Sequence, residues 1–165
     1  LASPSRSVSY IGNRFYRAPE LLLESNEYGP AVDIWSAACV IVEMMTGGNL
    51  LFKGDSVESQ LEAIVNVLGT PTEDDLNSFQ HSGRVYLPRG DPVPLERVIP
   101  HGIPSELLGL MRKIFVFNPN KRPTALECMK HSYFDPLFNN HYQLPNGNPL
   151  PPLNRDPTKQ RSSPE

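Results

Sequence analysis

The longest apolar stretch of the chain covers residues 31–45, AVDIWSAACVIVEMM. It leaves no wide polar face, and a helix that is apolar on all sides is buried in a core or in a membrane. The stretch is shorter than the ~20 apolar residues that a membrane span needs, and it contains Asp33 and Glu43. A proline before it and two glycines after it suit the ends of a helix. We therefore predict a central buried helix over residues 30–46.

Asp33 lies near the start of this predicted helix. The helix dipole stabilises a carboxylate at that position, but a buried carboxylate must also accept hydrogen bonds. We expect another part of the protein to supply the donors.

Residues 57–68 repeat apolar side chains at helical spacing. The apolar positions are Val57, Leu61, Ile64, Val65 and Leu68. Asp55 and Glu58 form a capping pattern ahead of them, Gly69 can end the helix, and Pro71 prevents its continuation. This pattern predicts an amphipathic helix over residues 57–68.

The second half of the chain also predicts helices, and no convincing buried strand, with residues 85–87 as a weak exception. One helix is expected over residues 104–117, where apolar side chains again follow a helical period. Thr124 and Glu127 form a capping box before another, and Thr72 with Asp75 caps a short helix that ends near Phe79. Shorter helical segments are predicted at residues 19–23, 72–79 and 125–130.

Proline accounts for 18 of the 165 residues, about twice the usual ~5%. The prolines gather in an insertion over residues 69–104 and in the tail over residues 139–165, while the helical segments are nearly free of them. The chain is therefore expected to be mainly α, with a long irregular insertion and a Pro-rich tail. Its parts are residues 1–23, 24–138 and 139–165.

Composition excludes several classes of protein. A net charge of −3 with no basic run argues against a nucleic-acid partner. One of the two cysteines, Cys39, lies in the predicted buried helix, which argues against a disulfide framework and for an intracellular protein of the cytoplasm or nucleus. No signal peptide or membrane segment is visible. The four histidines have no metal-ligand spacing, so we expect no metal site.

Several short motifs follow one another in a fixed order. Residues 14–20 are RFYRAPE, and Asp33-Ile-Trp35-Ser36 begins 13 positions after Glu20. Further along stand Gly54-Asp55, then LGTP at residues 68–71 and NPNKRPT at residues 118–124. Together these motifs resemble the second half of a eukaryotic protein kinase domain, from the activation loop through the large lobe.

Finer features resemble one branch of that family. The arginine before YRAPE and the long insertion are similar to the CMGC group of cyclin-dependent, mitogen-activated and glycogen-synthase-type kinases. SYI at residues 9–11, the helix at 57–68 and LPNG at 144–147 most resemble the glycogen synthase kinase 3 (shaggy) family. The resemblance implies that residues 1–23 end the activation segment and form the substrate-facing loop. Residues 24–138 would then form the helical C-lobe.

The resemblance implies a switch in the activation loop. Tyr10 matches a tyrosine that family members phosphorylate, and Arg14 and Arg17 match the arginines that hold the phosphate and contact the substrate loop. The alternative is an ordinary aromatic anchor with two solvated arginines.

Three further positions carry structural roles in the family. Glu20 and Arg122 match an ion pair that ties the substrate-facing loop to the base of the lobe. Asp33 matches the carboxylate that anchors the catalytic loop, which would supply its donors.

The predicted helix at residues 57–68 and the loop after it match a surface that binds scaffold proteins in this family. The corresponding positions are Leu61, Glu62, Val65, Val85 and Leu87. The alternative is an amphipathic helix that packs only on its own lobe, which explains the apolar stripe fully.

The chain has no Gly-rich loop, no V-A-I-K lysine, no H-R-D and no D-F-G. These elements bind ATP and Mg²⁺ and position the substrate hydroxyl, so no catalytic residue is expected here. The sequence is interpreted as part of a serine/threonine kinase whose other half binds ATP and Mg²⁺, and whose protein substrates are either primed phosphoproteins or unprimed proteins. The alternative is a stand-alone lobe that binds scaffolds or substrates without catalysis.

Overall fold

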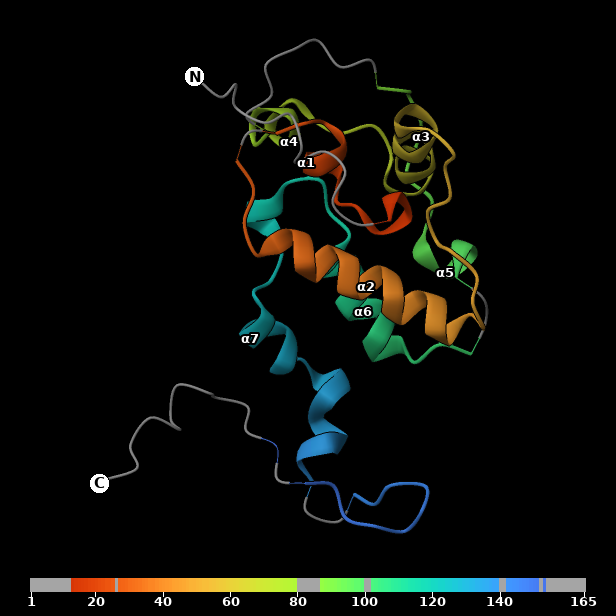
Figure 1. Ribbon diagram of the computed structural model, residues 1–165, viewed down its shortest axis with the longest axis vertical. Coiled ribbons are helices and arrows are strands. Elements are labelled where there is room, and N and C mark those ends of the chain that lie inside the picture. Colours follow the sequence, from red (N-terminus) through yellow and green to blue (C-terminus); the bar gives the residue numbers. More distant parts are fainter. Residues whose placement is uncertain are drawn as a thin grey trace, which may run out of the picture.

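The computed structural model describes residues 13–25, 27–79, 87–99, 102–139, 142–151 and 153 (Figure 1). Helices dominate these residues. Extended segments pair within the described residues at one isolated bridge, between Gln143 and Pro149. The helices are η2 (Arg14–Tyr16), α1 (Pro19–Leu22), α2 (Ala31–Met45), α3 (Val57–Leu68), α4 (Glu73–Asn77), α5 (Leu95–Val98), α6 (Ser105–Ile114), η3 (Pro119–Lys121), α7 (Ala125–Met129) and η4 (Ser132–Phe138). The predicted mainly α fold is confirmed.

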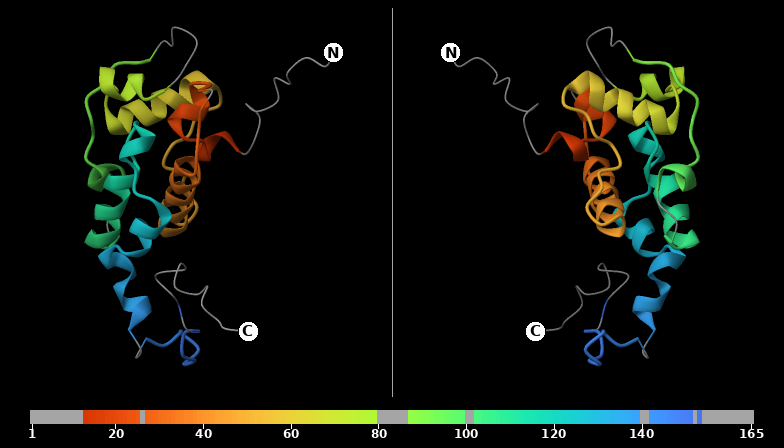
Figure 2. Two further views of the ribbon diagram at one scale, coloured as in Figure 1. Left: turned by 90° about the vertical axis from the view of Figure 1, so that its left-hand side faces the viewer. Right: turned by 90° about the vertical axis from the view of Figure 1, so that its right-hand side faces the viewer.

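Helix α2 forms the centre of the molecule and agrees with the predicted range to within one residue at each end. It packs against η2, α6 and η3. Figure 2 shows α2 in one layer and α5 with α6 in a second layer beside it. Segments from both halves of the chain are therefore assembled on one helix.

Three aromatic rings fill the core between these layers. Trp35 of α2 stacks on Phe52 with a centroid distance of 5.4 Å, and Phe115 meets both rings edge to face at 5.1 and 5.3 Å. Such offset and edge-to-face pairs add to the stabilisation from apolar burial. All three rings are buried.

The prediction that α2 is buried on all sides is wrong. One face is exposed along the whole helix, at Asp33, Ala37, Val40 and Met44. The Met44 side chain is 69% exposed and that of Val40 is 42% exposed. The spacing of these residues defines a single helical stripe. It is exposed because none of the described elements packs over it.

Helix α3 begins and ends where its periodicity predicts, but its cap differs from the prediction. Ser56 is the N-cap, and its hydroxyl accepts the N–H of Ser59 at 3.1 Å while the Ser59 hydroxyl accepts the N–H of Ser56 at 2.9 Å. The observed pair of Ser56 and Ser59 lies one position after the expected pair of Asp55 and Glu58. Ser56 is the cap because it has the extended backbone that a cap requires.

The capping boxes predicted at Thr72 and Thr124 are present at the starts of α4 and α7. In contrast, α6 ends at Ile114, three residues before its predicted end, with Phe115 as its C-cap. Helix η4 was not predicted, because Pro136 within it is typical of a break.

The long insertion contains α4 and α5, and hydrogen bonds join its two ends to each other and to α3. Thr70 N–H donates to Gly90 O at 2.9 Å, and Gly90 N–H donates to the Thr70 hydroxyl oxygen at 2.9 Å. Val93 N–H donates to Val67 O at 2.9 Å. The described ends of the insertion, residues 69–79 and 87–99, are thus folded onto the domain.

Candidate functional site

The candidate site is the loop over residues 13–20, and α2 holds its first part. The Tyr16 hydroxyl donates to Oε2 of Glu43 at 2.7 Å, and the Ser36 hydroxyl donates to the main-chain oxygen of Tyr16 at 2.7 Å. Because the Glu43 carboxylate accepts this bond, the pKa of Tyr16 is raised and its hydroxyl keeps the proton. Both anchors lie on α2, so the loop is fixed to the central helix at two points.

Gln60 holds the same loop from α3. Its amide nitrogen donates to the main-chain oxygens of Phe52 at 3.2 Å and Phe15 at 3.5 Å, and its amide oxygen accepts the N–H of Gly54 at 2.9 Å. Gly54 must be glycine, since a Cβ there would lie 2.2 Å from the main-chain nitrogen of Gln60. Sequence reasoning missed Gln60, although an amide on the apolar face of a helix is a signal of such a bond.

The end of the loop is held by an ion pair between Glu20 and Arg122. The two guanidinium nitrogens donate to the two carboxylate oxygens at 2.6 and 2.7 Å. The remaining N–H groups of Arg122 donate to the main-chain oxygens of Ala31, Val116 and Phe117, at 3.2, 3.1 and 3.0 Å. All five donors of the guanidinium thus have acceptors.

This pair lies deep in the protein. The Arg122 and Glu20 side chains are 0% and 1% exposed, and the guanidinium carbon lies 4.9 Å from the centroid of the Trp35 ring. A bidentate, fully bonded pair of this kind holds Glu20 in one position on the lobe.

Arg14 extends from η2 to the start of α3, where a terminal guanidinium nitrogen donates to the main-chain oxygen of Asp55 at 2.6 Å. The pKa of Glu58 nearby is lowered, chiefly by main-chain and Ser56 hydrogen bonds and to a smaller degree by the Arg14 charge. The Nε atom of Arg14 is buried and has no hydrogen-bond partner among the described residues. Arg14 therefore has a donor to offer a further acceptor.

Arg17 follows η2 and is half-buried. Tyr10, the predicted phosphorylation site, lies outside the described residues, so its position relative to the two arginines stays a prediction.

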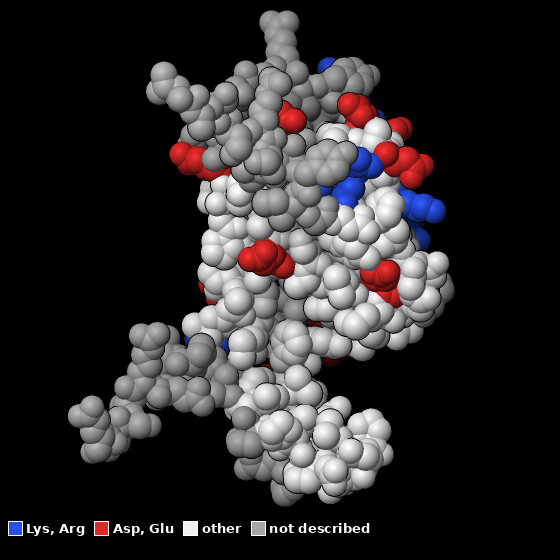
Figure 3. Space-filling view, viewed as in Figure 1, with Lys and Arg blue, Asp and Glu red and all other residues white. Residues whose placement is uncertain are grey.

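The exposure of Asp33 contradicts the prediction that it is buried. The sequence suggested a buried carboxylate that needs donors, whereas the side chain is exposed at the start of the exposed stripe of α2. Water can solvate a carboxylate in this position, and this removes the need for a donor among the described residues. Figure 3 shows that the surface over α2 is largely uncharged, with few acidic side chains.

The predicted scaffold-binding positions are not all on one surface. Leu61 and Val65 are 3% and 0% exposed and belong to the core, so they do not form an accessible docking surface. Glu62 is exposed, and Leu87 is half-buried against the core. Val85 lies outside the described residues. The burial of α3 agrees with the alternative of a helix that packs on its own lobe.

The described residues offer little other chemistry. They contain no group of three metal-ligating side chains, and none of their helices has the length and hydrophobicity to cross a bilayer. Both cysteines are free, and burial raises the pKa of the Cys39 thiol to about 12. At neutral pH this thiol is protonated and thus a poor nucleophile.

Comparison with known proteins identifies the family. Residues 1–134 match the model of the protein kinase domain. The chain is 38% identical over 151 residues to a protein of Trypanosoma brucei brucei (strain 927/4 GUTat10.1) named glycogen synthase kinase 3. The aligned region is 92% of this chain and 43% of that relative, so the chain spans less than half of the relative's length. The chain belongs to the protein kinase family and resembles its glycogen synthase kinase 3 branch.

Proposed function

We propose that this chain is the C-terminal part of a serine/threonine protein kinase that transfers the γ-phosphate of ATP to protein substrates, primed phosphoproteins among them. The chain would supply the activation loop, the substrate-facing loop and the C-lobe that supports both. Its own residues do not fit ATP or Mg²⁺, since the motifs that bind them are absent from the sequence. Those groups would be bound by the other part of the full-length protein.

The observation that carries this proposal is the rigid mounting of residues 16–20. Tyr16 is bonded to α2 and Glu20 is bonded to Arg122, so both ends of this short segment are fixed. Rates of group transfer depend on how well the acceptor is positioned, and a loop held at both ends positions a bound substrate with little loss of entropy.

Arg14 supports the proposed switch. Its buried Nε has no acceptor among the described residues, and an arginine that bonds phosphate forms short, charge-assisted bonds. Phosphate on Tyr10, four residues earlier in the chain, would carry about −1.5 to −2 charges and provide such acceptors. We propose that this bond, together with one from Arg17, sets the active arrangement of the loop.

Asp33 and the exposed stripe of α2 support a second role. An apolar stripe on the central helix of a domain is typical of a surface that another element covers. We propose that the catalytic loop of the full-length protein bonds to Asp33, and that its neighbouring helices cover Val40 and Met44.

We propose scaffold binding on a smaller surface than the sequence suggested. Among the described residues of the predicted surface, the exposed side of α3, which includes Glu62, and the partly accessible Leu87 are available for it. A scaffold would therefore contact the outer side of the helix, and not the apolar stripe that the sequence suggested.

The switch is tested with the full-length protein and a serine peptide in the presence of ATP and Mg²⁺. Tyr10→Phe and Arg14→Gln should each lower kcat/KM. Arg89→Gln, at an exposed arginine in the insertion, is the matched control and should leave it unchanged. Equal activity of all four proteins would contradict the switch, while the absence of transfer by the folded wild type would contradict kinase function itself.

A further inference from the structure

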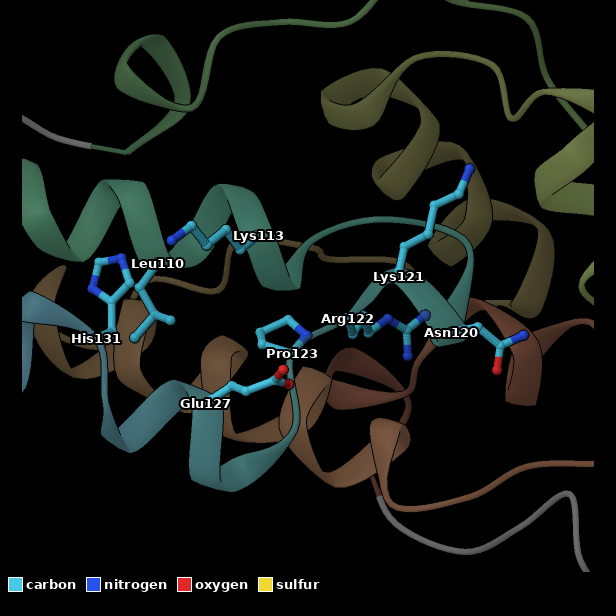
Figure 4. Close-up of a pocket in the computed structure, with 8 residues that line it drawn as sticks. All are labelled: Leu110, Lys113, Asn120, Lys121, Arg122, Pro123, Glu127 and His131. Carbon is cyan, nitrogen blue, oxygen red and sulfur yellow. The ribbon is translucent and has the colours of Figure 1, made fainter. Parts of the chain in front are cut away.

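A cavity of about 410 Å³ lies beside Arg122, the ion-pair partner of Glu20. It is formed by the last turn of α6, the segment around η3, and α7 with His131, two residues after the end of that helix (Figure 4). Leu110, Lys113, Asn120, Lys121, Pro123, Glu127 and His131 line it, with Arg122 at its base. Its volume lies within the range of sites that bind small ligands or peptide side chains.

Two of the cationic side chains at this cavity are already neutralised. Arg122 is paired with Glu20, and the Lys121 ammonium is bonded to Asp74 at 2.6 Å. Figure 4 shows the Lys121 ammonium directed away from the cavity. Neither side chain is therefore available to a ligand.

Lys113 differs from both. Within the described ranges it has no ion-pair partner, and Figure 4 shows its side chain directed toward the end of the cavity where His131 lies. An ammonium that faces a cavity without a counter-ion attracts an anion.

His131 adds a second donor at the same end. Its Nδ1 accepts the main-chain N–H of Tyr133 at 3.4 Å, so the neutral ring carries its proton on Nε2. The ring lies over Gly109, where a Cβ would be 4.0 Å from Nε2. Lys113 is one helical turn beyond Gly109 on the same face of α6. The Nε2–H and the ammonium therefore belong to one end of the cavity.

Glu127 lies at the other end of the cavity and offers a carboxylate acceptor instead of donors. One of its carboxylate oxygens accepts the N–H and the hydroxyl of Thr124 at 2.7 and 2.8 Å. These bonds lower the pKa of Glu127, so it stays ionised and can accept an N–H from a ligand through its other oxygen. A free anion would fill only one end of the cavity, whereas a peptide can place an acid at one end and an N–H at the other.

We propose that this cavity is a docking site for an extended peptide segment with an anionic side chain, either a carboxylate or a phosphate. The anion is bound by Lys113 and His131, a main-chain N–H of the peptide donates to Glu127, and Leu110 and Pro123 contact its apolar atoms. This site requires no catalytic step, so it stands apart from the proposed kinase activity.

The proposal is tested by fluorescence polarisation with the full-length protein. Four fluorescein-labelled peptides differ only in their central residue, which is glutamate, phosphoserine, glutamine or lysine. We expect the glutamate or the phosphoserine peptide to bind more tightly than the other two, and the tighter of the pair identifies the source of the anion. Lys113→Gln should weaken this binding by roughly tenfold or more, as loss of a charged hydrogen bond requires.

Lys53→Gln provides the matched control, because it removes the same charge at an exposed lysine outside the cavity. It should leave the affinity unchanged. His131→Phe, checked for folding by circular dichroism, should weaken binding independently of the lysine. Equal loss in Lys53→Gln and Lys113→Gln, binding of the glutamine or lysine peptide as tight as that of the tighter anionic peptide, or no binding of either anionic peptide would overturn the proposal.

Discussion

Arg122 is bonded through both terminal nitrogens to Glu20, a residue 102 positions earlier in the chain. The pair joins the end of the loop over residues 13–20 to the segment that follows α6, and it does so inside the protein, where neither charge is hydrated. The arrangement is stable only while both charges are present, because a single buried charge without its partner is strongly unfavourable.

Replacement of Glu20 by glutamine should therefore lower the free energy of unfolding by about 3–5 kcal/mol, since Arg122 stays buried without a counter-charge. Urea unfolding of the full-length protein measures this change. Lys121→Ala is the control, because it breaks an ion pair that is exposed to water and should have little effect. Similar losses in the two variants would contradict a special role for the buried pair.

Gly54→Ala should destabilise the protein by roughly 1–3 kcal/mol, because the new Cβ collides with the main chain of Gln60. Gly29→Ala is a matched control, as a Cβ at Gly29 meets no atom within 4 Å. Thermal melting of both variants checks the prediction. A melting temperature of Gly54→Ala equal to that of Gly29→Ala would show that the close contact is not maintained in solution.

Tyr16→Phe removes the hydroxyl that is bonded to Glu43 and keeps the ring. We expect kcat/KM of the proposed kinase reaction to fall roughly two- to tenfold, the effect of one hydrogen bond that positions the loop. Tyr28→Phe changes an exposed tyrosine and should have no effect. The two variants are compared in steady-state kinetics with one serine peptide. An unchanged value for Tyr16→Phe would mean that the bond does not position the substrate.

The cap of α7 should make stability depend on pH. The main-chain and hydroxyl hydrogen bonds from Thr124 lower the pKa of Glu127 below the ordinary value of a glutamate. Ionised Glu127 thus stabilises the folded state above about pH 4.5, and this contribution is lost as the pH falls through the lowered pKa. In urea titrations between pH 3 and 6, about the range of carboxyl titration, Glu127→Gln should lose part of this dependence. Thr124→Ala should lose the same part of the pH dependence of stability. If the two variants changed this dependence by different amounts, the proposed cap would be contradicted.

The exposed stripe of α2 makes a structural prediction about the full-length protein. If the catalytic loop and its neighbouring helices cover this face, a cysteine introduced by Val40→Cys should react slowly with a maleimide reagent. Gly29→Cys, in an exposed loop, should react rapidly. Equal rates at the two positions, read by mass spectrometry of the labelled peptides, would show that the stripe is not covered.

Local features of this fold could be predicted from the sequence. The bounds of α3 and the capping boxes at Thr72 and Thr124 follow from hydrogen bonds between residues three or four apart. Such patterns depend only on neighbours in the chain, so no knowledge of the rest of the structure is needed.

Features that depend on distant segments could not be predicted in this way. The apolar run of α2 shows that a helix forms, but not which elements cover each of its faces, and so the exposure of Asp33 was missed. The partnership of Glu20 and Arg122 came from family resemblance, because no local pattern links residues so far apart. The burial of Leu61 and Val65 likewise depends on how α3 packs, which the stripe alone does not specify.

The most direct test of the central claim is transfer of radiolabelled γ-phosphate from ATP to a peptide by the full-length protein in the presence of Mg²⁺. The peptide contains one serine, one threonine and one tyrosine, and hydrolysis of the product identifies the residue that is labelled. We predict phosphoserine or phosphothreonine. Label on tyrosine alone, or no label from a protein that circular dichroism shows to be folded, would contradict the account.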